Sequence, residues 1–179
     1  MGKITLILGG ARSGKSSYAQ KLAEDSAQSV TFLATAQAFD EEMSTRIQKH
    51  RTERPANWET LEIPFGIFSH AKQIKSEVVI LDCITLLVSN LMMQFVTDDL
   101  VDESLFMRSV QDEIKTLLSV IRESNQQWIM VSNEVGLGLV PPYQMGRVYR
   151  DAIGGANQHL AHEADQVLFM VAGIPMTVK

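Results

Sequence analysis

Eight residues near the N-terminus, residues 9–16 (GGARSGKS), constrain the fold more than any other segment. They follow an apolar run at residues 4–8 and precede a helical pattern at residues 16–27. This is the spacing G-x-x-x-x-G-K-[ST] between a strand and a helix, in which backbone N–H groups turn toward phosphate oxygens. The sequence therefore predicts a phosphate-binding loop at the carboxyl end of a strand in a parallel sheet.

The residue types of this loop suit a nucleoside triphosphate. Glycines at positions 9, 10 and 14 permit backbone torsion angles that side chains disfavour. We expect Lys15 to reach the terminal phosphates and the Ser16 hydroxyl to help hold Mg²⁺. A glycine-rich turn that binds nothing would not need the whole motif and both of its flanks. The predicted nucleotide-binding residues of the loop are Gly9, Gly10, Ala11, Arg12, Ser13, Gly14, Lys15 and Ser16.

The composition points to one soluble domain. A chain of 179 residues is long enough for a sizeable core, and we expect residues 1–179 to form a single nucleotide-binding domain. The net charge of -5 argues against general attraction to nucleic acid. The lone cysteine, Cys83, cannot form an internal disulfide, and we find neither a signal-peptide pattern nor an apolar run that would span a membrane. We therefore expect a cytoplasmic protein.

Strand and helix patterns alternate along the chain. Apolar runs predict strands at residues 4–8, 30–34, 58–63, 78–82, 128–132, 167–171 and 176–178. Helical patterns cover residues 16–27, 40–51 with Asp40 as cap, 67–74, 84–95, 105–123 and 144–164, while the acidic segment 97–104 is predicted to be a loop. This alternation predicts an α/β fold, in which helices flank a mostly parallel sheet that ends in an antiparallel hairpin.

Polar residues follow several predicted strands, at the edge where parallel sheets bind ligands. Asp82 stands where phosphate-loop proteins place a second ligand to Mg²⁺, so Ser16 and Asp82 are the predicted metal ligands. The alternative is that Asp82 caps the following helix. Cys83 stands where many ATPases have a glutamate base, which favours transfer to an acceptor other than water. For the segment Asn133-Glu134, a substrate contact and a structural turn both stay open.

His50 lies near the end of the predicted helix 40–51, among the cations Arg46, Lys49, Arg51 and Arg54. Nearby cations disfavour protonation of an imidazole, and a neutral imidazole can act as a nucleophile. The same cations would neutralise charge that develops on phosphate oxygens. Basic residues also suit the carboxyl end of any helix, so the residues alone leave open an ordinary surface histidine.

Together these segments resemble the bifunctional adenosylcobinamide kinase / adenosylcobinamide-phosphate guanylyltransferase family of cobalamin biosynthesis. The resemblance runs almost end to end, and its most selective parts are the blocks His-Arg-x-x-Arg-Pro and Asn-Glu-Val-Gly. It rests on residues 9–16, 34–36 (ATA), Arg46-Ile47, His50-Arg51, Arg54-Pro55, 81–85 (LDCIT), 133–141 (NEVGLGLVP), Arg150-Asp151, Gly154, Asn157-Gln158, Leu160-Ala161 and Ala164-Asp165.

The resemblance implies two reactions. A nucleoside triphosphate, ATP or GTP, phosphorylates the hydroxyl of adenosylcobinamide, and GMP then passes from GTP through a guanylylated histidine to adenosylcobinamide phosphate. His50 matches that histidine, so His50 and Lys15 become the catalytic candidates. The resemblance also implies a RecA-like phosphate-loop fold, a homotrimer and Mg²⁺. Its further nucleotide contacts fall on Ala34, Thr35, Ala36, Arg51, Thr52, Glu53, Arg54, Glu62 and Asp82.

Three alternatives are weighed against this interpretation. A GTP-dependent switch would carry a guanine-reading Asn-Lys-x-Asp tetrad, whereas Asn133 is followed by Glu134. A RecA-like protein that handles nucleic acid would need a basic surface, which the net charge of -5 opposes. An enzyme with only one of the two activities, or with a related small-molecule alcohol as acceptor, stays open.

Overall fold

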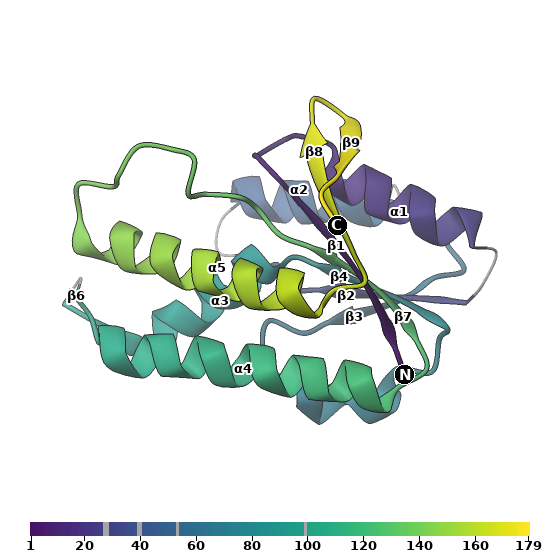
Figure 1. Cartoon of the computed structure of the whole chain (residues 1–179), viewed down its shortest axis with the longest axis horizontal. Coiled ribbons are helices and arrows are strands. Elements are labelled where there is room, and N and C mark those ends of the chain that lie inside the picture. The colour runs from purple at the N-terminus through teal and green to yellow at the C-terminus, as the bar shows by residue number, and fades with distance from the viewer. Residues whose placement is uncertain (27–28, 39–40, 53, 99) are drawn as a thin grey trace.

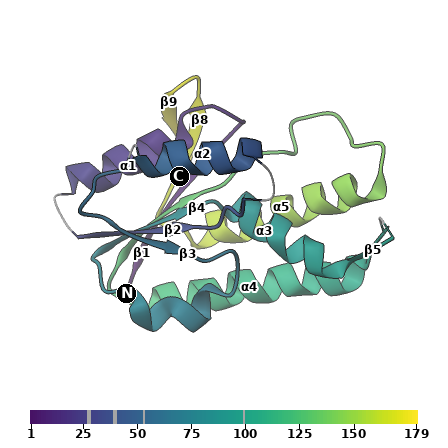
Figure 2. The ribbon, with the colours of Figure 1, turned by 180° about the vertical axis from the view of Figure 1, so that it is seen from behind.

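The computed structural model describes residues 1–26, 29–38, 41–52, 54–98 and 100–179, and within them a seven-stranded sheet separates two layers of helices (Figures 1 and 2). The strand order is β3-β2-β4-β7-β1-β8-β9. Neighbouring strands are parallel except for the pair β8–β9, which forms the predicted C-terminal antiparallel hairpin. The strands are β1 (Lys3–Gly9), β2 (Val30–Ala34), β3 (Glu59–Glu62), β4 (Val78–Asp82), β7 (Gln127–Val131), β8 (Gln166–Val171) and β9 (Ile174–Thr177).

The helices cover the two faces of this sheet unequally. The helices α1 (Lys15–Asp25) and α2 (Glu41–Thr52) lie on one face, and α3 (Ile84–Met92), α4 (Glu103–Glu123) and α5 (Gln144–Glu163) lie on the other (Figures 1 and 2). No helix within the described residues is long and apolar enough to cross a membrane.

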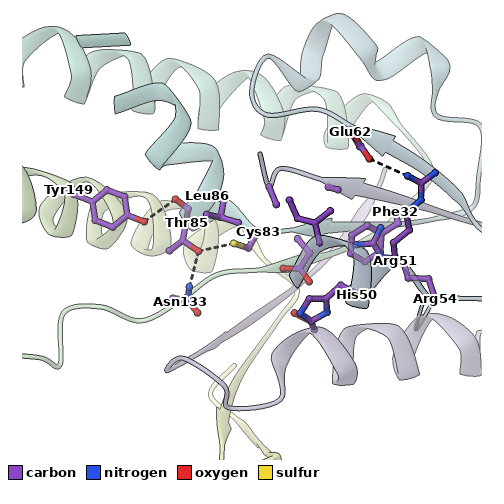
Figure 3. A pocket seen from close by; sticks show the side chains of 15 residues that line it. Phe32, His50, Arg51, Arg54, Glu62, Cys83, Thr85, Leu86, Asn133 and Tyr149 are labelled. Atoms are coloured by element: carbon purple, nitrogen blue, oxygen red, sulfur yellow. Dashed lines mark hydrogen bonds and ion pairs between the residues drawn. The ribbon is translucent and has the colours of Figure 1, made fainter. Parts of the chain in front are cut away.

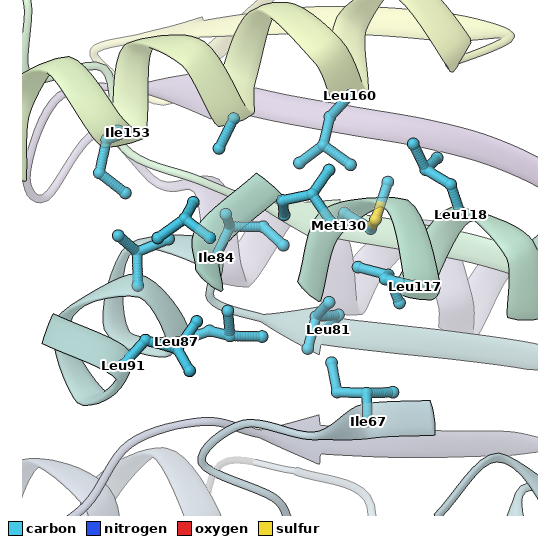
Figure 4. Packing of buried hydrophobic residues seen from close by; sticks show 14 of the residues in the cluster. Ile67, Leu81, Ile84, Leu87, Leu91, Leu117, Leu118, Met130, Ile153 and Leu160 are labelled. Carbon is cyan, nitrogen blue, oxygen red and sulfur yellow. The ribbon is translucent and has the colours of Figure 1, made fainter. Parts of the chain in front are cut away.

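The larger core lies between the sheet and the layer of α3, α4 and α5. Leu81 of β4 and Met130 of β7 pack there against Ile84, Leu117 and Leu160, one residue from each of the three helices (Figure 4). A smaller cluster on the opposite face includes Ala19 and Ala23 of α1. Because the central strands are buried on both faces, they are continuous apolar runs, as the sequence predicted.

The prediction of a loop at residues 97–104 was wrong. The short strands β5 (Val96–Thr97) and β6 (Leu100–Val101) pair antiparallel there, and α4 begins at Glu103. Asp102 is the N-cap, and its carboxylate accepts a hydrogen bond of 3.1 Å from the backbone N–H of Leu105. The acidic residues that suggested a loop therefore include the cap that starts the helix, whereas residue 99 lies outside the described residues.

Other elements differ from prediction in length or type. The predicted helix 84–95 ends at Met92 and continues as a 3-10 turn, η2 (Met93–Phe95), and the predicted helix 67–74 is the 3-10 helix η1 (Ile67–Gln73). The helix α5 runs unbroken through Gly154 and Gly155, because packing against α3 and α4 outweighs their low helix propensity. The proposed cap Asp40 lies outside the described residues.

The strand order brings distant segments to one edge of the sheet. β7 lies between β1, which leads into the glycine-rich loop, and β4, which ends at Asp82. The residues that follow β7 are therefore positioned between the loop and Asp82, and a backbone hydrogen bond of 3.0 Å from Glu134 N–H to the Gly9 carbonyl ties them to the loop.

Candidate active site

Two of the three glycines of the glycine-rich loop adopt the backbone torsion angles that the sequence predicted, whereas Gly10 does not have a positive φ angle. Gly9 and Gly14 have φ angles of +152° and +92°, which L side chains rarely adopt. A Cβ at Gly9 would lie 2.7 Å from the carbonyl oxygen of Met170 and 2.8 Å from Oγ of Ser13. The turn between β8 and β9 also contacts the loop, since Gly173 N–H donates to the Ser13 carbonyl at 3.0 Å. The C-terminal hairpin thus packs against the loop and supports it.

Gly9→Ala is expected to destabilise the fold by about 1–3 kcal/mol, because the added methyl group meets backbone atoms and the φ angle is strained. Urea unfolding followed by circular dichroism measures the change. Gly10→Ala is the matched control, because none of the described atoms lies within 4 Å of a Cβ there, and its effect should stay within about 0.5 kcal/mol. Equal effects of the two substitutions would contradict this account of the loop.

Lys15 lies inside the loop with its ammonium group already engaged. Its Nζ donates a hydrogen bond of 2.6 Å to the Gly10 carbonyl, and the side chain is buried. Burial lowers the pKa of Lys15, an effect that Cys83 and Asp82 partly oppose. A phosphate oxygen in the loop would replace this carbonyl as a partner that carries a full negative charge.

Asp82 is the acidic centre of the site. The Ser16 side chain acts on its carboxylate and favours the charged form. Burial raises the pKa of Asp82, and Ser16 together with the charges of His50, Arg54 and Lys15 opposes this rise. Asp82 does not cap α3, since the N-cap residue is Cys83 and none of the described side chains caps that helix.

The pair of Ser16 and Asp82 fits a Mg²⁺ ion. A hydroxyl and a carboxylate are hard oxygen donors, and Mg²⁺ in phosphate sites needs only one or two protein ligands besides phosphate and water oxygens. The described residues contain no group of three or more His, Cys, Asp or Glu side chains that would form a metal cage of their own. These donors therefore suit a metal that arrives with a nucleotide.

A cavity of about 310 Å³ opens beside Asp82 (Figure 3). It brings together eight of the predicted site residues, namely Ser16, Ala34, Ala36, His50, Arg51, Arg54, Glu62 and Asp82. The lining residues that the sequence did not single out for the nucleotide are Phe32, Ile47, Cys83, Thr85, Leu86, Asn133 and Tyr149. Figure 3 shows His50, Arg51, Arg54 and Glu62 toward one side of the cavity, and Thr85, Asn133 and Tyr149 on the other.

The basic side of the cavity comes from α2 and the segment after it. The guanidinium of Arg54 lies 3.5 Å from the centre of the Phe32 ring, a cation–π contact that holds the group in place. Burial lowers the pKa of Arg54, and Asp82 opposes this effect. Arg51 forms an exposed ion pair of 3.8 Å with Glu62. His50 is exposed and shares this side of the cavity with both arginines.

The opposite side of the cavity is a polar network centred on Thr85. Its Oγ1 accepts a hydrogen bond of 3.0 Å from Nδ2 of Asn133 and contacts Sγ of Cys83 at 2.9 Å. The Tyr149 hydroxyl donates to the Thr85 carbonyl at 2.9 Å, and Nδ2 of Asn157 donates to the Asn133 carbonyl at 3.0 Å. Asn133 is thus held by hydrogen bonds and also lines the cavity, while a direct substrate contact stays a prediction.

Burial keeps the ionisable groups of this network neutral. It raises the pKa of the Cys83 thiol to about 11 and also raises the pKa of the Tyr149 phenol. Cys83 is therefore a small buried side chain, as the sequence predicted.

Sequence reasoning missed Phe32 and Thr85 as lining residues, because apolar and small polar residues at strand ends and helix starts resemble ordinary core positions.

Thr35 and Thr52 do not line the cavity. Thr35 is fully buried, where its Oγ1 donates to the Cys83 carbonyl at 2.8 Å and accepts from the Cys83 N–H at 2.8 Å. Thr52 is exposed at the end of α2, and Glu53 lies outside the described residues, as do the side chains of Arg46 and Lys49. Direct nucleotide contacts at these positions stay predictions.

Thr35→Val is expected to destabilise the protein by about 1–3 kcal/mol, because the Cys83 N–H would lose its partner in a buried position. The substitution keeps the side-chain volume nearly constant, so packing should contribute little. Thermal or urea unfolding measures the loss. If Thr35→Val were as stable as the parent but bound nucleotide less well, the structural role of the hydroxyl would be contradicted.

Nearly the whole chain is similar in sequence to one family of enzymes. The family profile described as "Cobinamide kinase / cobinamide phosphate guanyltransferase" matches residues 5–178. The chain belongs to this family. Its relatives include bifunctional adenosylcobalamin biosynthesis proteins from Pseudomonas aeruginosa (42% identical, covering 97% of this chain and 96% of that protein) and Escherichia coli strain K12 (38% identical, covering 97% and 98%).

Two solved structures have folds similar to that of this family member. It is similar to the flagellar accessory protein FlaH from Methanocaldococcus jannaschii, with a TM-score of 0.53, 15% identity, and coverage of 99% of this chain and 78% of that chain. It is also similar to the RadB recombinase, with a TM-score of 0.52, 15% identity, and coverage of 93% and 73%. These likenesses concern the fold alone, and they confirm the predicted RecA-like phosphate-loop architecture.

Proposed function

We propose that a single site in this chain serves both activities of its family, cobinamide kinase and cobinamide-phosphate guanylyltransferase, and that His50 carries GMP in the second. The observation that carries this proposal is the shared cavity. His50, Ser16, Arg54 and Asp82 line one space, although they come from the start of α1, from α2 and the segment after it, and from the end of β4. A nucleophile, phosphate-binding cations and the donors for a metal therefore face the same ligand.

The glycine-rich loop and Lys15 would hold the triphosphate of GTP or ATP. Backbone N–H groups at the start of α1 favour anionic oxygens, and the ammonium of Lys15 adds a full positive charge. Ser16 and Asp82 would hold Mg²⁺, which when bound neutralises charge on the phosphate oxygens. Arg51 and Arg54 would bind phosphate oxygens on the other side of the cavity.

In the kinase reaction, the acceptor hydroxyl of adenosylcobinamide attacks the γ-phosphorus of the nucleotide. The new P–O bond forms to this hydroxyl oxygen, the bond to the β-phosphate oxygen breaks, and the hydroxyl proton leaves to solvent. The products are adenosylcobinamide phosphate and a nucleoside diphosphate. Lys15 stabilises the charge that accumulates on the transferred phosphoryl group.

In the guanylyl reaction, an imidazole nitrogen of His50 attacks the α-phosphorus of GTP and pyrophosphate leaves. The enzyme then carries GMP through a phosphorus–nitrogen bond. A phosphate oxygen of adenosylcobinamide phosphate attacks the same phosphorus, His50 leaves, and adenosylcobinamide-GDP forms. Arg54, which the Phe32 ring holds in place, is positioned to neutralise the charge that develops in both steps.

The proposal includes an assembly and a location. We expect the chain to form a homotrimer in the cytoplasm, with ATP or GTP as phosphoryl donor and no nucleic-acid partner. Light scattering coupled to size-exclusion chromatography measures the first of these directly. A mass of one or two protomers at working concentration would contradict the trimer and leave the chemistry untouched.

Covalent labelling tests the proposed chemistry. The protein is incubated with Mg²⁺ and GTP radiolabelled at the α-phosphate, then denatured, and the label on the protein is counted. We expect a label that is acid-labile and base-stable, as a phosphorus–nitrogen bond on histidine would be. Absence of label, with GTP binding intact, would reduce the chain to a kinase that uses no covalent intermediate.

A further inference from the structure

An apolar loop projects from the molecule between β7 and α5, at the upper left in Figure 1. Four large apolar side chains in it are mostly exposed: Leu137 (82%), Leu139 (97%), Val140 (63%) and Tyr143 (62%). Single exposed apolar residues are ordinary, but several in one short segment mark an interaction surface. We call residues 137–143 the apolar loop.

The apolar loop is held in this position by hydrogen bonds at both ends. Nη1 of Arg147 donates to the carbonyls of Pro141 at 3.2 Å and Pro142 at 2.8 Å. At the other end, Gly136 N–H donates to Oε1 of Glu134 at 2.6 Å, and Nδ2 of Asn157 donates to the Asn133 carbonyl. These hydrogen bonds therefore fix a loop whose apolar side chains are exposed to water and do not pack into the core of the protein.

The segment that carries the apolar loop starts and ends at the wall of the candidate active site. Asn133 precedes the loop and Tyr149 follows it on α5, and both line the cavity. Thr85 connects the two, because it accepts a hydrogen bond from each of them. The apolar loop is thus joined to the side of the cavity that lies opposite His50 and the arginines (Figure 3).

We propose that the apolar loop binds the corrin macrocycle of the acceptor while its hydroxyl-bearing arm enters the cavity past Asn133 and Tyr149. This inference rests on the proposed function. A cavity of about 310 Å³ is at the low end of what one drug-sized ligand occupies, and the nucleotide needs part of it. A corrin macrocycle with its amide side chains is far larger than the arm, so it stays outside and requires a surface at the cavity wall.

The chemistry of the apolar loop suits this occupant. The faces of a corrin ring are largely hydrocarbon, and leucine, valine and tyrosine side chains contact such faces with favourable burial of apolar area. The alternative occupant is a second copy of this chain, for which an exposed apolar loop would be part of a subunit interface. If the loop binds the corrin macrocycle, a polar substitution in it should weaken substrate binding. If the loop binds a second copy of the chain, the same substitution should change the molecular mass in solution.

The test is the double variant Leu137→Ser, Leu139→Ser in the full chain. Both side chains are exposed, so the substitutions should leave the fold intact. The matched control is Phe68→Ser on η1, which removes an exposed apolar side chain (60%) from the segment that packs against α4. Three quantities are measured on each protein: KM for adenosylcobinamide in the kinase reaction, GMP labelling without adenosylcobinamide, and mass by light scattering.

We expect the double variant to raise KM for adenosylcobinamide about tenfold or more, with GMP labelling, mass and KM for the nucleotide unchanged. The control should match the parent in all measurements. An unchanged KM for adenosylcobinamide, or a change in mass, would overturn the inference, the latter by assigning the loop to a subunit interface. Absence of labelling in the parent protein would instead count against the proposed function.

Discussion

His50→Ala is expected to abolish covalent labelling by α-labelled GTP while cobinamide kinase activity stays within a few-fold of the parent. The reason is that the two reactions are expected to use different nucleophiles. His50 is the proposed nucleophile at the α-phosphorus, whereas the kinase step uses the substrate hydroxyl at the γ-phosphorus. Because His50 is exposed on α2, its removal should cost little stability. Label on the denatured protein and phosphorylated cobinamide are the two measurements.

His162→Ala is the matched control for this experiment, because His162 is exposed near the end of α5 and does not line the cavity. It should label like the parent. Label at parental stoichiometry on His50→Ala would show that another residue carries GMP. Loss of both activities in His50→Ala would show that the imidazole also binds the nucleotide, which would contradict the division between the two steps.

Lys15→Ala is expected to lower both activities by about 10²- to 10³-fold, the usual loss when one donor to a transition-state charge is removed. Lys15 sits in the loop that would hold the triphosphate for both reactions, so neither activity should survive at the parental level. Within the described residues, the Lys15 side chain donates a hydrogen bond to the Gly10 carbonyl alone, so the fold should persist. Steady-state rates of both reactions and a circular dichroism spectrum measure the outcome.

Lys21→Ala is the control for this second experiment, because Lys21 lies on the same helix but is exposed and outside the cavity. Its activities should equal those of the parent. If Lys15→Ala lost one activity and kept the other, the two reactions would use separate nucleotide sites. The two variants together therefore separate what is shared, the triphosphate site, from what belongs to guanylyl transfer alone.

Much of the candidate site was predictable because its residues belong to short motifs that can be recognised from their immediate neighbours in the sequence. The run from Gly9 to Ser16 contains its own glycines, lysine and hydroxyl, and Asp82 ends an apolar strand, which places it at the ligand-binding edge. His50 was ambiguous from its surroundings in sequence, and only the resemblance to a family favoured a chemical role. Its presence in one cavity with Ser16 and Asp82 supports that role on independent grounds.

Other features were not predictable, since they depend on partners far away in the chain. The acidic segment 97–104 was interpreted as a loop, but Asp102 is a helix cap and Leu100 pairs with Thr97 in a short hairpin. Thr85 belongs to the segment 81–85 that contributes to the family resemblance, but no role in the site was predicted for it. In the fold it joins Asn133 and Tyr149, which lie 48 and 64 positions away, into one wall of the site.

The sequence by itself determined the strands, the phosphate loop and the family of this protein, because glycine torsion angles, apolar runs and motif spacing act over a few neighbouring residues. Only the tertiary structure decided which strand ends lie side by side. Insertion of β7 between β1 and β4 places Asn133 between the loop and Asp82, and α2 places His50 at the same cavity. Strand order follows from packing of the whole core, and no local segment contains that information.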